Sequence, residues 1–429
     1  MRRLALLGTL AVIGLLLACN GGGEPSSTAT PAPSASGTSS ATPTMAPTPT
    51  VTEAALGPAQ PVALEEGAPV TEAGTYVVDV KSTRVWKVAE FATVQWSPDG
   101  STLMILASNM AVSIDLADIE EGSAVRILSD DVVAAAWSPD GRRIAFSGHI
   151  DGTKGLHVIN RDGSGLELLS EKEGYALEWS PRGDHIALHG EGLYMVEVAT
   201  AETSQIADAT QQPWYPLSVS WSPDGALFAF VDDSGLYVYD AETGERRQVA
   251  VGPSGGPILW SPDGSRIAFR FGPRVALTRG IDAGKPEAGF RIFHVVEVDG
   301  SGEPKPLPPG RKLSWSPDGR KIVYLSEGCI ADDWDLYTVD PDGGLLARLT
   351  NTPETVKEGP FWSPTGTAIA FSIIEELILA DAESGEQRVL TVSGERESLN
   401  PGIHLHDPPW SPDGRYIMFS AGGGHGVCD

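Results

Sequence analysis

The stretch AAAWSPDGRRIAFSG, residues Ala134–Gly148, joins a run that ends in tryptophan to a second run rich in β-forming residues through a compact turn. Its central five letters, WSPDG, recur along the chain, beginning at Trp96, Trp137, Trp221, Trp260, Trp315 and Trp410. Two variants, WSPRG at Trp179 and WSPTG at Trp362, complete a set of eight. The intervals are 41, 42, 42, 39, 55, 47 and 48 residues. A period of roughly 40–45 residues is typical of a four-stranded propeller blade.

The residue order within the motif predicts a type I turn. Serine, proline, aspartate and glycine are each favoured at their respective positions, and glycine takes the left-handed conformation that closes the hairpin. Arg182 and Thr365 replace the aspartate in the two variants, while proline and glycine remain. We therefore interpret the motif as a turn device rather than a row of catalytic aspartates. Its eight tryptophans are predicted to pack between neighbouring blades, each burying about 200 Å².

The residues around the motif predict an all-β fold, an eight-bladed β-propeller over residues 74–429. Short β-rich runs follow each motif, such as RIAFS at Arg143 and GLYVYD at Gly235, which is the pattern of strands joined by tight turns. Only 19 residues follow Trp410, enough for the turn and one more strand. The runs TYVVDV at Thr75 and RVWKVA at Arg84 are predicted to supply the last two strands, a two-plus-two closure that removes an open sheet edge.

The repeat also resembles a known family. WSPDG, followed by R-x-I-A-F and a later L-Y-V-x-D, is similar to the repeat of TolB-type (WD-repeat-like) propellers and of the propellers in prolyl-oligopeptidase relatives. The likeness covers about residues 74–429, although this chain has eight motifs where TolB has six. It implies a propeller and no single function, because many proteins use this repeat. GPSGG at Gly252 fits a nucleophile-elbow pattern, but it lies between two predicted strands without a following helix, so we interpret it as a loop.

The N-terminus predicts export. Arg2 and Arg3 precede an uncharged stretch of apolar and small residues, Leu4–Ala18, which is shorter than the roughly 20 residues of a membrane span and typical of a signal peptide. LLAC at Leu16–Cys19 resembles the bacterial lipoprotein signal, which implies removal of residues 1–18 and lipidation of Cys19; an ordinary cleaved signal peptide is the alternative. Of the 27 residues 24–50, 24 are Ser, Thr, Pro or Ala, which predicts a disordered tether over residues 19–73. The folded part is then expected outside the cytoplasm, lipid-anchored to the membrane or envelope.

The net charge and a few polar residues limit the classes of partner that the protein can bind. With 57 acidic and 30 basic residues the chain carries a charge of −27, which argues against a nucleic acid or an anionic lipid surface as partner. We expect a monomer without a cofactor. Cys329 and Cys428 are a possible disulfide, permitted by export. They belong to blades six and eight, which are not neighbours, so the bond is left open.

A group of three histidines supports an alternative prediction of function. His404 and His406 alternate in an extended segment, and His425 follows the last strand of the same blade. Three histidines suit a divalent transition metal, and the set resembles that of metal-dependent pectate-fragment lyases built on TolB-like propellers. The resemblance implies an exported metal-dependent polysaccharide lyase or other hydrolytic enzyme.

The leading prediction is a non-catalytic binding platform for a protein, peptide or glycan. The WSPDG turns and the third-to-fourth turns share one face of a propeller and are short, whereas the connections on the other face are long and irregular. Loops on a rigid scaffold are the usual binding elements. The predicted binding residues are Trp214, Tyr215, Asp332, Asp333, Trp334 and Asp335. Alternatively, the two tryptophans only plug the tops of their blades.

Overall fold

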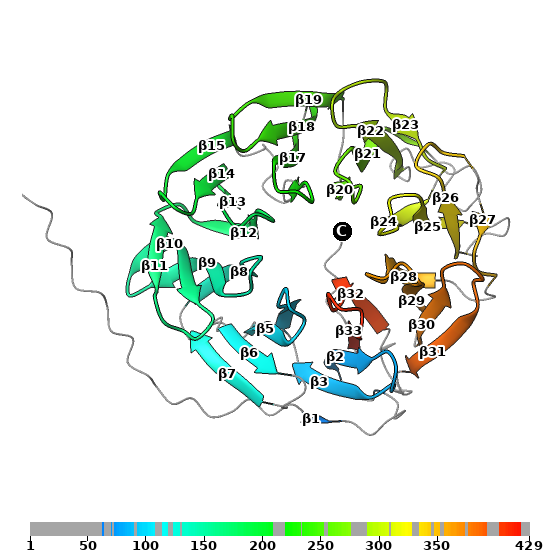
Figure 1. The fold of residues 1–429 in the computed structure, drawn as a ribbon, viewed down its shortest axis with the longest axis horizontal. Helices are drawn as coiled ribbons and strands as arrows, with labels where there is room; N and C mark the ends of the chain where they lie inside the picture. Colours follow the sequence, from blue (N-terminus) through cyan, green and yellow to red (C-terminus); the bar gives the residue numbers. More distant parts are fainter. Residues whose placement is uncertain are drawn as a thin grey trace, which may run out of the picture. The chain divides into compact units, whose positions relative to one another are not determined.

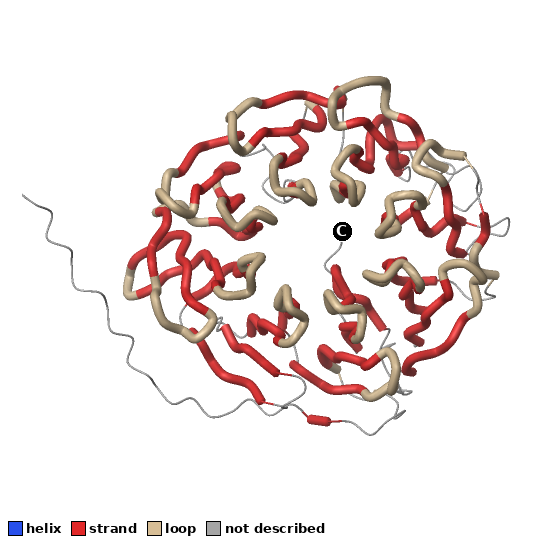
Figure 2. Tube along the Cα trace, viewed as in Figure 1, coloured by secondary structure: helices blue, strands red, loops and turns tan. Residues whose placement is uncertain are grey.

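The computed structural model describes residues 62–63, 70, 73–89, 92–107, 114–118, 123–128, 131–208, 219–232, 234–252, 256–275, 290–308, 310–327, 334–344, 347–351, 356–373, 376–392 and 403–421. The chain divides into residues 1–52 and 53–429, and all described residues belong to the second unit. All regular secondary structure in the described residues is β-strand (Figure 2). Within the described ranges, no helix is long and apolar enough to cross a bilayer.

Eight antiparallel sheets stand around a common centre, which confirms the predicted eight-bladed propeller (Figure 1). In blades 1–7 the four strands follow one another in sequence, with the tryptophan-bearing strand innermost. Blade 1 comprises β4 (Ala92–Trp96), β5 (Thr102–Ala107), β6 (Ile114–Asp118) and β7 (Ser123–Leu128), and blade 2 comprises β8 (Asp131–Trp137), β9 (Arg143–Ile150), β10 (Thr153–Asn160) and β11 (Glu167–Ser170). Blade 3 comprises β12 (Gly174–Trp179), β13 (His185–Gly190), β14 (Gly192–Glu197) and β15 (Thr203–Asp208), and blade 4 comprises β16 (Val219–Trp221), β17 (Leu227–Asp232), β18 (Gly235–Asp240) and β19 (Arg246–Val251).

Blades 5 to 7 repeat this arrangement at the other side of the ring. Blade 5 comprises β20 (Leu259–Trp260), β21 (Arg266–Val275), β22 (Phe290–Glu297) and β23 (Lys305–Pro306). Blade 6 comprises β24 (Arg311–Trp315), β25 (Ile322–Glu327), β26 (Trp334–Val339) and β27 (Ala347–Arg348). Blade 7 comprises β28 (Val356–Trp362), β29 (Ala368–Ile373), β30 (Glu376–Asp381) and β31 (Gln387–Val392). The second strands carry the largest buried side chains, such as Phe146, Phe230 and Phe371. The core is therefore a series of apolar layers between adjacent blades.

The eighth blade combines strands from the two ends of the folded unit. β32 (Ile403–Trp410) and β33 (Tyr416–Ala421) are followed in the sheet by β2 (Gly74–Asp79), β3 (Val85–Ala89) and the short β1 (Val62–Ala63). β2 pairs with β33 along its whole length, from Gly74 opposite Ala421 to Asp79 opposite Tyr416. The rings of Tyr76 and Phe419 stack at 5.5 Å across this pairing. Val70, in the stretch predicted as tether, is also buried, in the apolar cluster around this blade.

Each WSPDG turn satisfies its own polar groups. In blade 2, Gly141 N donates to Ser138 O at 2.8 Å. Ser138 Oγ donates to Asp140 Oδ1 at 2.6 Å and accepts from Arg143 N at 2.9 Å. The hydrogen bond from Ser138 is the main reason why the pKa of Asp140 is lowered. In the WSPRG copy, Ser180 Oγ donates instead to Asp184 Oδ1 at 2.6 Å, so the missing acid is replaced two residues further on.

The motif tryptophans form a chain of hydrogen bonds around the ring. In seven blades the indole Nε1 donates to the backbone carbonyl of the residue that precedes the tryptophan of the previous blade, at 3.1–3.4 Å. The pairs are Trp96 to Pro409, Trp179 to Ala136, Trp221 to Glu178, Trp260 to Ser220, Trp315 to Leu259, Trp362 to Ser314 and Trp410 to Phe361. Each of these seven tryptophans thus connects its blade to the one before it.

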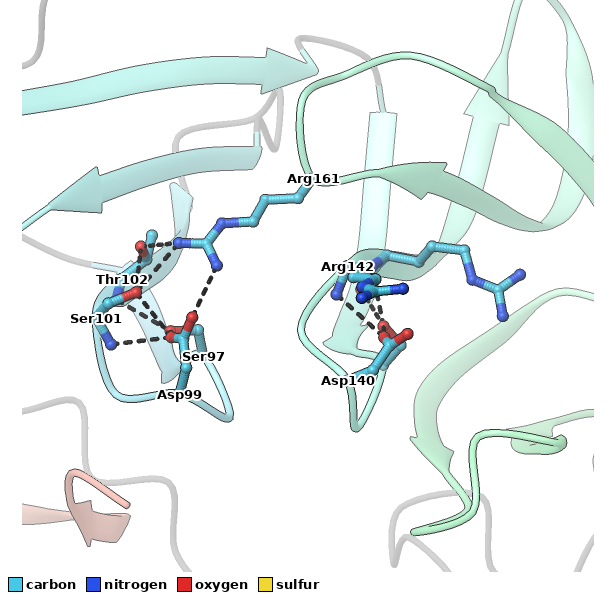
Figure 3. A network of polar contacts seen from close by, with 9 residues as sticks. Ser97, Asp99, Ser101, Thr102, Asp140, Arg142 and Arg161 are labelled. Carbon is cyan, nitrogen blue, oxygen red and sulfur yellow. Dashed lines mark hydrogen bonds and ion pairs between the residues drawn. The ribbon is translucent and has the colours of Figure 1, made fainter. Parts of the chain in front are cut away.

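The exception lies between blades 1 and 2. Nε1 of Trp137 is buried and has no hydrogen-bond partner among the described residues. Arg161, in the turn after β10, instead places its guanidinium 5.5 Å from the Trp137 ring centre. Figure 3 shows that it reaches across to blade 1, where it donates to Asp99, Ser101 and Thr102. An ionic clamp therefore connects these two blades where the indole bond is missing.

Candidate functional site

The two faces of the ring differ in composition. The SPDG face carries the first-to-second and third-to-fourth turns, and the loop face carries the second-to-third connections and those between blades. Because the innermost strands end at the motif tryptophans, their first residues lie at the loop face. Six large apolar side chains are exposed among the described residues. Four lie on outermost strands, whereas Val133 and Tyr175 lie near the loop-face ends of the innermost strands β8 and β12.

β-Bulges place Val133 and Tyr175 in these exposed positions. In blade 2, Val132 pairs with Gly148 and Ala134 with Ser147, so Val133 is an extra residue. In blade 3, Gly174 pairs with Gly190 and Ala176 with His189, so Tyr175 is extra in the same way. A bulge breaks the alternation of side chains and redirects the extra residue. The exposed fractions are 53% for Val133 and 47% for Tyr175.

Glycines at the ends of the partner strands make these bulges possible. A Cβ on Gly148 would lie 2.2 Å from Asp131 O, and one on Gly190 would lie 2.1 Å from Glu173 O. No side chain fits at such distances, so the backbone of the bulged strand approaches because the partner is glycine. The two bulged strands also lie side by side. Gly174 N of β12 donates to Ser147 Oγ of β9 at 2.9 Å.

Tyr175 is held in place by a buried histidine. Its hydroxyl lies 3.0 Å from Nε2 of His189, and the two ring centres are 4.7 Å apart. His189 is only 3% exposed, and burial lowers its pKa, so the imidazole is neutral near neutral pH. An exposed aromatic ring with a fixed orientation offers a contact surface at little cost in side-chain entropy.

A group of ionisable side chains lies at the boundary of blades 2 and 3, and one of them, Glu173, is two residues before Tyr175 in the sequence. His149 lies between two carboxylates, with Nδ1 at 3.3 Å from Asp131 Oδ2 and Nε2 at 3.3 Å from Glu173 Oε1. Lys154 Nζ lies 3.3 Å from Glu173 Oε2. Asp131, His149 and Lys154 belong to blade 2, whereas Glu173 directly precedes β12 of blade 3. We call Asp131, Val133, His149, Lys154, Glu173, Tyr175 and His189 the Tyr175 site.

A cleft opens beside the same inter-blade connection. It measures about 460 Å³ and is lined by residues of blades 2 and 3, among them Ser170, Lys172, Tyr194 and Gln205. Lys172 Nζ lies 5.0 Å above the Tyr194 ring. Blades 2 and 3 together therefore carry a cleft, one exposed apolar side chain each and ionisable side chains of both kinds. This combination suits ligand binding, since it offers apolar area together with hydrogen-bonding partners.

The structure describes only part of the binding residues predicted from the sequence. Trp214, Tyr215, Asp332 and Asp333 lie outside the described residues, as do Cys19 and both cysteines of the possible disulfide, Cys329 and Cys428. Trp334 is the first residue of β26. Asp335 follows it and is fully buried, forming an ion pair with Arg348 and accepting from Thr350 Oγ1 at 2.8 Å. Its carboxylate thus has partners within blade 6.

Two of the three predicted metal ligands are described. His404 and His406 lie on β32 at the loop face, and His425 is outside the described residues. His406 Nε2 lies 2.7 Å from Ser420 Oγ. Burial, together with the charge of His404, lowers the pKa of His406 to about 4, so it is neutral near neutral pH. Within the described ranges, no three His, Cys, Asp or Glu side chains are grouped to hold a metal ion.

Sequence reasoning missed the Tyr175 site because it compared loop lengths. The connection SEKEGY, Ser170–Tyr175, is short, so its length does not mark it as a binding loop. One signal in the sequence is a glycine near the end of the second strand, in RIAFSG and HIALHG. A glycine there removes the Cβ that otherwise keeps the neighbouring strand in regular register.

Comparison with known proteins places the chain among propellers. No family model matches it. The uncharacterized peptidase YuxL of Bacillus subtilis is 31% identical over 198 residues, which is 38% of this chain and 28% of the relative. The uncharacterized protein Atu1656 of Agrobacterium fabrum is 26% identical over 261 residues, covering 57% of this chain and 83% of the relative. The chain thus spans less than a third of the first relative.

Solved structures share the fold at low sequence identity. The C-terminal WD40 domain of Sif2 matches with a TM-score of 0.52 and 14% identity, over 82% of this chain and 98% of that one. The dihydro-heme d1 dehydrogenase NirN matches with a TM-score of 0.51 and 17% identity, over 78% of each chain. A putative TolB from Agrobacterium tumefaciens is also similar, with a TM-score of 0.36 and 16% identity over 82% of this chain and 98% of that one. The two matches with TM-scores above 0.5 confirm the predicted propeller at the level of the fold.

Proposed function

We propose that this protein is a non-catalytic binding platform, exported and held at the bacterial envelope by a lipid on Cys19, which captures a protein, peptide or glycan on its loop face. The propeller supplies a rigid support, and residues 19–61, which precede β1, serve as its tether. In this proposal Trp214, Tyr215, Asp332, Asp333 and Trp334 extend the binding surface over blades 3 to 6.

The contrast between the two faces carries this proposal. In the WSPDG turns the serine and aspartate side chains are occupied within the turn, as in Ser138 and Asp140. On the loop face, β-bulges expose Val133 and Tyr175 on strands whose motif tryptophans, Trp137 and Trp179, are buried. Turning apolar area towards water costs stability, about 25 cal/mol per Å², and such exposure marks interaction sites. A binding role accounts for that cost.

Site-specific crosslinking in the native envelope tests the binding face. A photoreactive phenylalanine analogue replaces Tyr175 in one full-length variant and Glu242, on the SPDG face, in another. We expect specific adducts at position 175 that disappear when unlabelled protein competes. Equal or stronger specific crosslinking from position 242 would show that the ligand binds the other face.

The envelope anchor needs a separate experiment. Replacing Cys19 with serine should release the protein from the membrane fraction, and mass spectrometry of the wild-type N-terminal peptide should show the acyl mass. A Cys19→Ser variant that stays with the membrane would contradict lipid anchoring, without bearing on the binding face.

A further inference from the structure

The cleft between blades 2 and 3 lies between β11, the outermost strand of blade 2, and the outer strands β14 and β15 of blade 3 (Figure 1). We infer that this cleft binds a small zwitterion, a molecule that carries both a carboxylate and an ammonium group, as free amino acids and short peptides do. The inference goes beyond the proposed loop-face platform and does not depend on it.

β-Bulges shape both sides of the cleft. Leu169 is the extra residue where β11 pairs with β10, and Ile206 is the extra residue where β15 pairs with β14. A bulge bends its strand and increases the local twist. A Cβ on Gly192 would lie 3.1 Å from Gln205 Nε2 and 3.2 Å from the Tyr194 hydroxyl. The two polar groups that line the blade 3 side therefore lie close to the same glycine.

Lys172 supplies a positive charge to the cleft. Its Nζ lies 5.0 Å from the ring centre of Tyr194, whose side chain packs in the apolar layer between the two blades. An ammonium group has three hydrogen-bond donors, and Lys172 forms no ion pair with any residue that the structure describes. The tyrosine ring thus holds an ammonium in the cleft that can still bind a carboxylate.

Ser170 adds a buried donor beside this ammonium. Its Oγ accepts from Thr203 Oγ1 at 3.0 Å and from the backbone N of Lys172 at 3.3 Å. Both acceptor positions of the hydroxyl are therefore used, and its own hydrogen has no acceptor among the described residues. Ser170 is only 8% exposed, and a buried hydroxyl group without a partner is costly. A ligand carboxylate in the cleft would accept this hydrogen bond.

Glu171 gives the cleft a negative charge as well. It lines the same cleft, is exposed, and forms no ion pair within the described part of the chain. A simple anion would be repelled by Glu171 and a simple cation by Lys172, whereas a zwitterion is attracted by both. A zwitterion also has no net charge, so the charge of −27 on the chain does not keep it away.

The size of the cleft indicates a small molecule. Its volume of about 460 Å³ lies in the lower part of the range of roughly 300–1,000 Å³ that is usual for small-ligand sites. A free amino acid or a short peptide fits that volume.

Calorimetric titration of the full-length mature protein tests the inference. The panel contains the common amino acids, dipeptides made from them, and matched analogues that lack either the amino or the carboxyl group. We expect binding of an amino acid or a dipeptide, with each analogue at least about tenfold weaker, about 1.4 kcal/mol. Lys172→Gln and Glu171→Gln should each weaken binding by a similar factor. Gln205→Trp, which places a large ring in the cleft, should abolish it.

Matched controls remove the same charges outside the cleft. Lys81→Gln, in the turn between β2 and β3, and Glu191→Gln, between β13 and β14, should leave the affinity unchanged. Thermal melting shows that each variant is folded, and if Gln205→Trp is not, the two charge variants decide. The inference is overturned if no panel member binds, if the analogues bind as tightly as the zwitterions, or if binding survives Lys172→Gln and Glu171→Gln. Crosslinking at position 175 tests the loop face separately, so either proposal can fail without the other.

Discussion

Arg161 and Asp99 form an ion pair across the boundary between blades 1 and 2, with 3.1 Å between Nη1 and Oδ2 (Figure 3). This is the boundary at which the Trp137 indole lacks the hydrogen bond that the other seven tryptophans make. The pair crosses from the third-to-fourth turn of blade 2 to the WSPDG turn of the preceding blade, blade 1. Burial alone would raise the pKa of Asp99, but hydrogen bonds from Ser97, Ser101 and Arg161 lower it well below its usual range.

Removing this clamp should weaken the ring. We expect Arg161→Ala to lower the free energy of unfolding by about 1 kcal/mol, because both side chains are partly exposed and such pairs are worth little individually. Urea denaturation measures the change. Arg142→Ala is the control, since only the backbone of Arg142 is bonded to Asp140, and it should change stability by less than about 0.5 kcal/mol. Equal effects of the two substitutions would show that the clamp contributes nothing.

Glu178 should make stability depend on pH. It lies on β12 next to Trp179, and burial raises its pKa to about 7 from the usual 4.5. Between pH 4.5 and 7 the carboxyl ionises in the unfolded chain while it stays protonated in the folded one, so stability falls across this window and levels off above it. Relative to wild type, Glu178→Gln should gain stability as the pH rises, by at most about 3 kcal/mol.

Chemical denaturation over that pH range, with exposed Glu242→Gln as the control, measures the effect of Glu178. The control variant should follow the wild-type pH profile throughout. A constant difference between Glu178→Gln and wild type at all pH values would mean that the carboxyl does not titrate in this window.

Closure of the eighth blade gives a third prediction. β2 supplies six residues that pair with β33, so deleting residues 74–90 should expose that edge. We expect loss of the cooperative thermal transition, or aggregation, because an unpaired edge strand recruits other chains. Deletion of residues 24–50 within the tether is the control and should leave the melting temperature unchanged. A deletion of 74–90 that melts like wild type would disprove the closure.

The tryptophans of the irregular loops provide a fourth prediction. Trp214→Ala combined with Trp334→Ala should weaken capture of the native ligand at least about tenfold, about 1.4 kcal/mol, because large aromatic side chains dominate binding surfaces. Quantitative pull-down from the native envelope measures the loss. Glu242→Gln and Glu383→Gln, in turns of the SPDG face, should have little effect. The reverse pattern would place binding on the SPDG face.

The sequence predicts the ring well because the same WSPDG-type turn recurs in every blade. Proline, glycine and a large aromatic residue at fixed spacing determine a hairpin and an inter-blade contact without help from distant residues. The Tyr175 site is different. Gly174–Trp179 reads as an ordinary strand, and the exposure of Tyr175 depends on a bulge against β13 and a glycine, Gly190, fifteen positions later. Such a register shift is a property of two paired strands, so one segment alone does not reveal it.

The tryptophan hydrogen bonds have a consequence for chain topology. Trp96 donates to Pro409 across the point where the two ends of the folded unit meet, in the same sense as the contacts elsewhere in the ring. The order of inter-blade contacts is therefore cyclic and does not record where the polypeptide starts. A circular permutant that joins the old termini with a flexible linker, and opens in the turn between β13 and β14, would keep every one of these indole bonds. Only the lipid tether would then leave the ring at a different blade.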